Sequence, residues 1–283
     1  MKKISVIFPL MLALVACMQD ETGGNQQTPE QNTAAAGGTS PIQADKPQEA
    51  SDEKMTKEEK RTRDELKAET TEAFKVLKTK RDEYNTKLKS EKTAYEALAT
   101  GITATQNKVE IPVGITGFTE AVDQAKIYAS LGYDNDLIEK LDTVIKGLSI
   151  SDVNSHAKEI QTVAGIFSLL VSLEDATKKI MDGHLQDKNL TKIENDKSKI
   201  KKATAELKLF ISSRDAFIES IQKTIEVVHT TNFTSSNEAR AELDKIIATD
   251  EVTSSAAPSE AGYLHSKVEA VKKNEEALDA LMK

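Results

Sequence analysis

The chain of 283 residues contains one cysteine, Cys17, and its position is the strongest chemical signal in the sequence. Met1-Lys2-Lys3 is a short cationic start, and residues 4–16 are uncharged and mostly apolar. This run is too short to span a bilayer, which needs about 20 apolar residues, so it is typical of a secretory signal. Leu14-Val15-Ala16-Cys17 then matches the bacterial lipobox, where cleavage between Ala16 and Cys17 exposes a thiol and an amine for acylation.

We predict that Cys17 is lipidated and anchors the chain to a membrane. Two or more acyl chains anchor a protein stably, because each buried methylene contributes about 0.8 kcal/mol. The alternative is an ordinary signal peptide in which the cysteine is incidental. Because the chain has no second cysteine, an intramolecular disulfide and a cysteine-based zinc cluster are both excluded.

No pattern in the sequence predicts a catalytic, metal or cofactor site. The four histidines, at 156, 184, 229 and 265, do not have the spacing of a metal or catalytic pair. Asp134-Asn135-Asp136 begins like a calcium loop but lacks an oxygen ligand at the fifth position and a glycine at the sixth. Phosphate-binding glycine loops and the serine nucleophile elbow do not occur. We therefore expect no enzymatic activity, no metal and no cofactor.

Two arginines, Arg81 and Arg214, interrupt otherwise apolar stripes of predicted helices. A ligand site is one interpretation. The simpler interpretation is a guanidinium that reaches solvent or pairs with a carboxylate between helices. His156 is likewise interpreted as a polar edge of its helix.

The charge balance argues against nucleic acid as a partner. Lys and Arg number 38 against 46 Asp and Glu, for a formal charge of −8, whereas binding to phosphates needs a basic face. Residues 1–16 contain two lysines and no acid, so a chain cleaved before Cys17 would carry −10. Such a chain is not held on anionic lipid by its charge, and lipidation must provide the attachment.

Composition divides the chain into three parts: a signal peptide at 1–16, a lipidated cysteine with a disordered tether at 17–52, and a helical domain at 53–283. The tether holds three of the six prolines and two Gly-Gly pairs among small polar residues. This composition cannot bury enough apolar surface to offset the entropy of ordering. As a flexible chain of about 35 residues it would span roughly 30–35 Å.

Apolar residues three and four apart predict an all-α, elongated bundle of six or seven helices in the third part. The predicted helices cover 53–100, 118–131, 134–147, 151–183, 191–229, a short segment after Ser235, and 259–282, with a loop from Gly101 to Gly117. We expect N-caps at Asp134, at Ser151 or Asp152, and at Ser235, where Glu238 completes a capping box. The segment 163–173 is apolar nearly all round, which predicts the central helix, and Ser212-Ser213 is the expected kink.

Part of the helical region resembles a known family. Ile127-Tyr-Ala-Ser-Leu-Gly-Tyr-Asp134, Ile138-Glu-Lys-Leu141 with Ile145, and Ser213-Arg-Asp-Ala-Phe-Ile218 with Ile221 resemble the paralogous helical outer-surface lipoproteins of Borrelia, which include a complement regulator-acquiring surface protein. The likeness covers about residues 118–230, and residues after 230 match nothing we can place. The resemblance implies an α-helical body exposed at the bacterial surface. It carries over no binding residue.

From these observations we expect a lipid-anchored outer-surface protein that binds host proteins, in complement evasion or colonisation. Members of the family that the chain resembles bind complement regulators, plasminogen or matrix, and many have no known ligand. Lys283, at the end of the sequence, offers the ammonium and carboxylate that plasminogen kringles bind, which makes it the one candidate contact. The alternative is a periplasm-facing envelope lipoprotein without a host ligand. The oligomeric state is open, a homodimer included.

Overall fold

Helices make up nearly all of the regular structure in a computed structural model that describes residues 56–101, 109–112, 114–115, 117–150, 152–247 and 264–283. They are α1 (Lys57–Gly101), α2 (Ala121–Ser130), α3 (Asn135–Gly147), α4 (Ala157–Lys178), the π-helical turn η2 (Lys179–His184), α5 (Asp187–Leu190), α6 (Lys197–Thr230), α7 (Ser236–Ile247) and α8 (Leu264–Met282). The described residues contain no strand. The predicted all-α bundle is confirmed, and the helix beyond the expected number is the four-residue α5.

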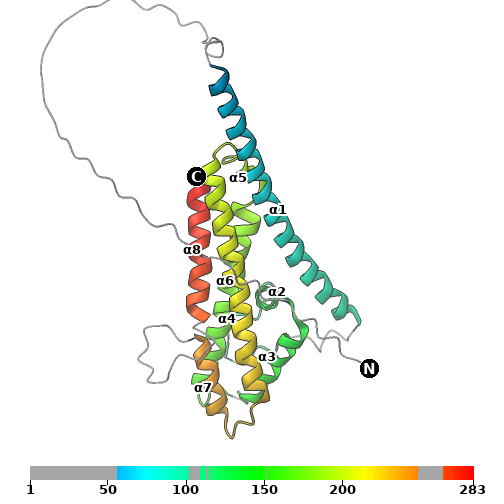
Figure 1. The fold of residues 1–283 in the computed structure, drawn as a ribbon. Helices are drawn as coiled ribbons and strands as arrows, with labels where there is room; N and C mark the ends of the chain where they lie inside the picture. The colour runs from blue at the N-terminus through cyan, green and yellow to red at the C-terminus, as the bar shows by residue number, and fades with distance from the viewer. Residues whose placement is uncertain (1–55, 102–108, 113, 116, 151, 248–263) are drawn as a thin grey trace, which may run out of the picture. The chain divides into compact units, whose positions relative to one another are not determined.

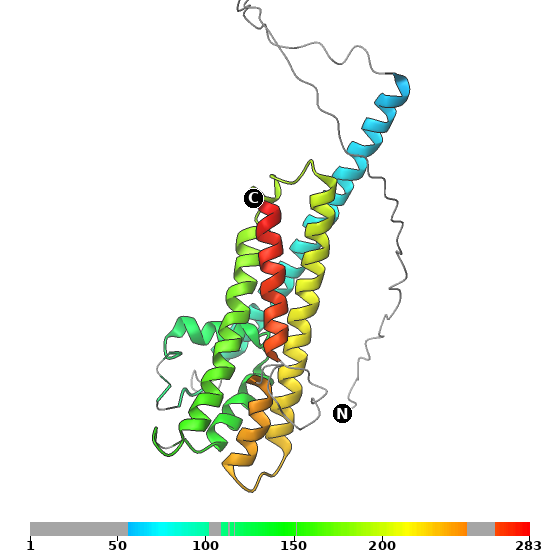
Figure 2. The ribbon, with the colours of Figure 1, turned by 90° about the vertical axis from the view of Figure 1, so that its left-hand side faces the viewer.

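Three long helices form the centre of the bundle. In Figure 2 α8 lies between α4 and α6, and it contacts both. At one end of the bundle α7 packs on α4 and α6 (Figure 1). On other sides, α1 and α3 contact α6, and α2 contacts α4. Every helix therefore covers the apolar stripe of a neighbour, as the periodicity requires.

The predicted central helix is confirmed in α4. Val163, Phe167, Leu170 and Leu173 have no exposed surface, and the helix contacts α2, α7 and α8. Its predicted N-cap is wrong. Asp152 Oδ1 instead accepts hydrogen bonds from the N–H groups of Asn154 and Ser155, so these residues form a turn and the helix begins only at Ala157. Ser151 lies outside the described residues.

The helical path of α4 ends close to the predicted Gly183, but its last turn is a π-helix. Leu185 N–H donates to the carbonyl of Ile180 at 2.9 Å, five residues back. The next long helix, α6, begins at Lys197 and not near 191, because Asp196 caps it by accepting from the N–H of Lys199. No break occurs at Ser212-Ser213, and α6 is continuous to Thr230.

Two other predicted caps are confirmed. Asp134 accepts from the N–H of Leu137 at 3.2 Å and starts α3. Ser235 Oγ accepts from the N–H of Glu238 at 3.4 Å, although the Glu238 carboxylate reaches back to Thr234 and not to Ser235. Gly132, at φ +69°, adopts the left-handed conformation that ends α2 and that glycine adopts without steric cost.

Burial along α1 is greatest in the middle of the helix and falls toward both ends. The spacing of three and four predicts a stripe of Phe74, Leu77, Arg81, Tyr84, Leu88, Glu91, Tyr95 and Leu98. Leu77, Arg81 and Tyr84 are buried, Leu98 is 51% exposed, and the others are half-buried. The stripe is therefore confirmed over its first part only. The less buried C-terminal half of α1 forms one wall of a cleft.

Candidate functional site

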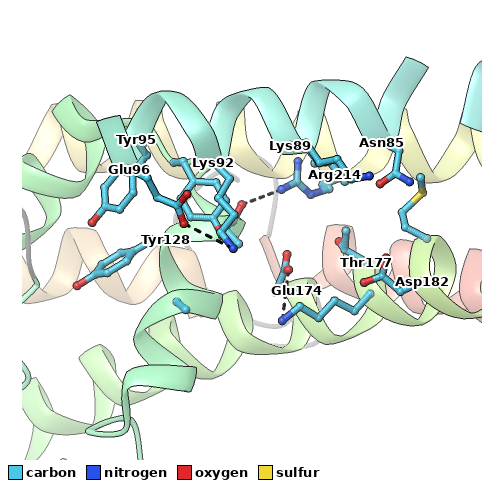
Figure 3. Close-up of a pocket in the computed structure, with 16 residues that line it drawn as sticks. Asn85, Lys89, Lys92, Tyr95, Glu96, Tyr128, Glu174, Thr177, Asp182 and Arg214 are labelled. Atoms are coloured by element: carbon cyan, nitrogen blue, oxygen red, sulfur yellow. Dashed lines mark hydrogen bonds and ion pairs between the residues drawn. The ribbon is translucent and has the colours of Figure 1, made fainter. Parts of the chain in front are cut away.

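A cleft of about 440 Å³ lies between the C-terminal half of α1, the end of α2, the end of α4 with η2, and one residue of α6. Figure 3 shows α1 on one side and α4 on the other, with side chains from both directed into the space between them. The cleft thus joins segments that are far apart in the sequence. It is the best candidate for a ligand site in the described part of the chain.

Three tyrosines form an aromatic cluster on the lining of the cleft. The ring of Tyr95, from α1, lies 5.7 Å from the ring of Tyr128 in α2 and 5.5 Å from that of Tyr133. Burial raises the pKa of Tyr128 and of Tyr133 to about 12, so both hydroxyls stay protonated at physiological pH. Tyr128 Oη accepts the N–H of Val109, which fixes that ring.

Arg214 is the one residue that α6 contributes to the lining. It is 1% exposed, and its Nη2 donates to the carbonyl of Ala129 at 2.7 Å while Nη1 donates to Tyr84 Oη at 3.3 Å. Its Nε is buried and has no hydrogen-bond partner among the residues that the structure describes. The prediction that Arg214 reaches solvent or pairs with a carboxylate is therefore wrong, because the guanidinium is buried and its two acceptors are a phenol and a main-chain carbonyl.

Glu174 projects from α4 into the middle of the cleft (Figure 3). Its side chain is 10% exposed, and burial raises its pKa to about 7 against the opposing effects of Arg214 and Lys178. Among the described residues its one polar contact is Lys178 Nζ at 3.9 Å, which is too long for a hydrogen bond. At neutral pH this carboxyl group can act as an acceptor or a donor.

Charged side chains surround the opening of the cleft. Lys92 and Glu96, both from α1, pair at 3.6 Å and are mostly exposed. Lys89 of α1 and Asp182 of η2 also line the cleft. These groups are well solvated, so each contributes less electrostatic energy than the buried Glu174 and Arg214.

The other arginine of the predicted stripes behaves as expected. Arg81 Nη1 donates to Asp187 Oδ1 at 2.9 Å and to the carbonyl of Leu185 at 2.8 Å. Asp82 on its own helix accepts from Arg81 Nε at 2.8 Å. The predicted pairing with a carboxylate between helices is confirmed, and it connects α1 to α5 at the end of the bundle.

The remaining predicted residues are not brought to the cleft. Ala16 and Cys17 lie outside the described residues, as do the predicted parts 1–16 and 17–52. Lys283 is exposed at the end of α8, where its Nζ pairs with Asp279 Oδ2 at 2.5 Å. His156 is exposed to 22% and contacts Asp152.

The Asp134-Asn135-Asp136 segment has a structural explanation. Asp134 caps α3, and Asp136 pairs with Lys140 at 2.8 Å. Within the ranges that the structure describes, no three His, Cys, Asp or Glu side chains form a group that could hold a metal ion. A search of the same ranges found no helix with the length and hydropathy of a membrane span.

Sequence reasoning identified Arg214 but missed Glu174 and the tyrosine cluster. Glu174 directly follows the apolar segment 163–173, and a carboxylate next to such a segment is a usable signal of a buried acid. The three tyrosines come from α1, α2 and the turn after α2, so only the fold brings them together.

Comparison with known proteins does not assign the chain. No protein-family model matches it, and no curated protein matches it significantly. The resemblance to the Borrelia lipoproteins therefore stays a prediction.

Proposed function

We propose that this chain is a lipid-anchored, non-enzymatic lipoprotein of the bacterial outer surface that binds host proteins in complement evasion or colonisation. The observation that carries the proposal is Leu14-Val15-Ala16-Cys17, which directly follows an uncharged apolar run. The sole cysteine occupies the one position that a lipobox requires. Acylation at Cys17 would hold in the membrane a protein whose acidic charge gives it no affinity for anionic lipid.

The helical body has properties that suit recognition of other proteins. Long helices present broad faces, and protein partners bind such faces through apolar and charged contacts. Large apolar side chains are exposed on several of them, including Val122 at 59% and Leu98 at 51%. The resemblance of residues 118–230 to the Borrelia outer-surface lipoproteins supports the same role. This resemblance lies in the pattern of residues that pack between helices.

Protease treatment of intact cells separates surface display from the alternative, a periplasm-facing envelope lipoprotein. We expect the helical body to be digested while a periplasmic marker protein stays intact. Protection of the body until the outer membrane is permeabilised would favour the periplasmic alternative. A Cys17→Ala variant should no longer partition into the detergent phase when cells are extracted.

Host binding is tested by incubating serum with cells that display the chain and with cells that lack it. We expect the displaying cells to retain at least one host protein, identified by mass spectrometry. Equal retention by both cell types, with equal survival in serum, would refute host binding. Deletion of Lys283 tests the plasminogen alternative, because a kringle contact through this residue would be lost while other binding would persist.

A further inference from the structure

We propose that the cleft between α1, α2 and α4 binds an alkylammonium or alkylguanidinium group, the head of a lysine or arginine side chain of a partner protein, with Glu174 as its counter-ion. The cleft itself indicates the chemical class of the ligand, a cationic head on an aliphatic stem. The inference that a partner polypeptide carries this group rests on the proposed function.

Glu174 is a buried acceptor to which no group in the described part of the chain donates a hydrogen bond. Its side chain is nine-tenths buried, points into the cleft, and contacts Lys178 Nζ only at 3.9 Å. An ionised carboxylate has about four acceptor sites, and leaving them empty in a desolvated place is costly. A ligand that brings N–H donors and positive charge would remove this cost.

The walls of the cleft suit the aliphatic part of a long cationic side chain. Leu88, Ala125 and Met181 add apolar surface to the three-tyrosine cluster. Lysine and arginine bury their methylene stems along such surfaces while the charged head reaches a polar group. Electron-rich ring faces also attract cations, which favours an ammonium over a neutral head.

The cationic residues of the cleft do not make it an anion site. Arg214 directs Nη1 and Nη2 to Tyr84 and to the carbonyl of Ala129, and its Nε has no exposed surface, so a ligand cannot reach it. Lys92 is paired with Glu96. Lys89 is exposed at the opening, where solvent and salt screen its charge.

Lys178 shows that an ammonium can approach Glu174 from within the chain. It lies one helical turn after Glu174 on α4, and its side chain is 51% exposed. At 3.9 Å it gives weak Coulomb attraction without a hydrogen bond, and a solvated pair of this kind is worth little. A partner's side chain could therefore displace Lys178 into solvent and approach Glu174 more closely.

Ionisation of Glu174 should control the binding. The charged groups that act on it are Arg214 from α6, with Lys178, Asp175 and Asp182 from α4 and η2. Lys89, Lys92 and Glu96 line the cleft from α1, and Tyr133 from the turn after α2. Because burial raises the pKa of Glu174 to about 7, we expect tighter binding of a cation at about pH 8.5 than at about pH 5.5.

The experiment titrates the full chain, in a non-ionic detergent, with n-butylammonium and n-butylguanidinium chloride. Potassium chloride at equal ionic strength, n-butanol and sodium butyrate are the controls. The chain has five tyrosines and no tryptophan, and three of the five line the cleft, so the change in tyrosine fluorescence is the signal that is followed. We expect saturable changes with the two cations only, and binding that is stronger at the higher pH.

Three variants test the role of each group. Glu174→Gln should weaken binding of n-butylammonium about ten-fold, because it replaces a charged hydrogen bond by a neutral one. Lys178→Met should strengthen binding, because it removes the internal competitor. Glu219→Gln, which removes an exposed carboxylate of α6 outside the cleft, is the matched control and should change the affinity by less than about two-fold. Far-ultraviolet circular dichroism checks that each variant is folded.

Specific results would overturn the proposal. These are a folded chain that gives no saturable response to either cation, equal affinity in the Glu174→Gln variant, and binding of butyrate in place of the cations. An affinity for n-butylammonium that is unchanged or lower in the Lys178→Met variant would also contradict the proposal. None of these results depends on a host protein, so failure here differs from failure of the serum and protease experiments above.

Discussion

Arg214 on α6 donates a hydrogen bond of 2.7 Å from Nη2 to the main-chain carbonyl of Ala129 on α2. The two residues are 85 positions apart, and the bond is buried. Within the described ranges no carboxylate lies at ion-pair distance from this guanidinium, and its Nε has no partner. The bundle therefore encloses a positive charge whose two acceptors are neutral dipoles, and this charge acts on the carboxyl group of Glu174.

Replacement of Arg214 should separate the contribution of its volume from that of its hydrogen bonds. We expect Arg214→Ala to lower the free energy of unfolding by about 3 kcal/mol, because it leaves a cavity and removes two hydrogen bonds. Arg214→Met keeps most of the volume and should cost about 1 kcal/mol. Urea unfolding followed by circular dichroism gives both values. Equal losses in the two variants would contradict the buried placement.

Glu174 should make the protein less stable as the pH rises. Its pKa is about 7 in the folded state against an ordinary 4.5, so between these values the unfolded state releases a proton that the folded state keeps. The resulting loss of stability is about 3 kcal/mol and is complete above about pH 7. Below about pH 4.5 both states hold the proton and the loss disappears.

The measurement is the difference in unfolding free energy between Glu174→Gln and the unchanged protein. We expect no difference below about pH 4.5 and a more stable variant, by about 2–3 kcal/mol, above about pH 7. Glu96→Gln serves as the control for removal of a carboxylate near the cleft. A constant difference across this range would show that Glu174 is not desolvated.

The centre of the bundle should not tolerate a charge on α4. Leu170 has no exposed surface, so Leu170→Asp places an unpaired carboxylate in the core and should cost more than about 4 kcal/mol, enough to unfold many domains. Ser168→Asp, on an exposed position of the same helix, is the matched control and should melt near the unchanged protein. Equal melting temperatures for the two variants would refute the central position of α4.

Gly165 allows α7 to approach α4 closely. A Cβ built at this position would lie 3.0 Å from Ile247 Cγ2. We expect Gly165→Leu to destabilise the protein by about 1–3 kcal/mol through overpacking. Gly147→Leu, at the end of α3, meets no atom within 4 Å of its Cβ. That variant should be neutral or slightly stabilising in thermal unfolding, because leucine favours helix more than glycine does.

Local patterns in the sequence were sufficient to predict most of the helices. The stripe on α6, from Ile200 to Val228, is buried as its spacing indicates, and Asp134 and Ser235 cap the helices that follow them. The errors occur where side chains compete for the same backbone groups. Asp152 satisfies two N–H groups in a turn, and Asp196 starts a helix in a segment that was expected to be helical already.

The candidate site was less predictable because it depends on tertiary contacts. Arg81 and Arg214 stand out as charged groups in apolar stripes, but only packing brings Arg214 to the carbonyl of Ala129. The pKa of Glu174 depends on burial by neighbouring helices. The apolar segment before Glu174 signals a buried acid, but the sequence does not show which helices cover it. Sequence periodicity identifies which face of a helix is buried, but it does not identify the helix that packs against that face.

The most direct test of the proposed function is mass spectrometry of the N-terminal peptide of the mature protein purified from bacterial membranes. We expect a chain that begins at Cys17, with a diacylglyceryl group on the thiol and an acyl chain on the amine. A mature chain that begins at another residue, or that begins at Cys17 with a free thiol, would contradict the lipid anchor and with it the proposed surface display.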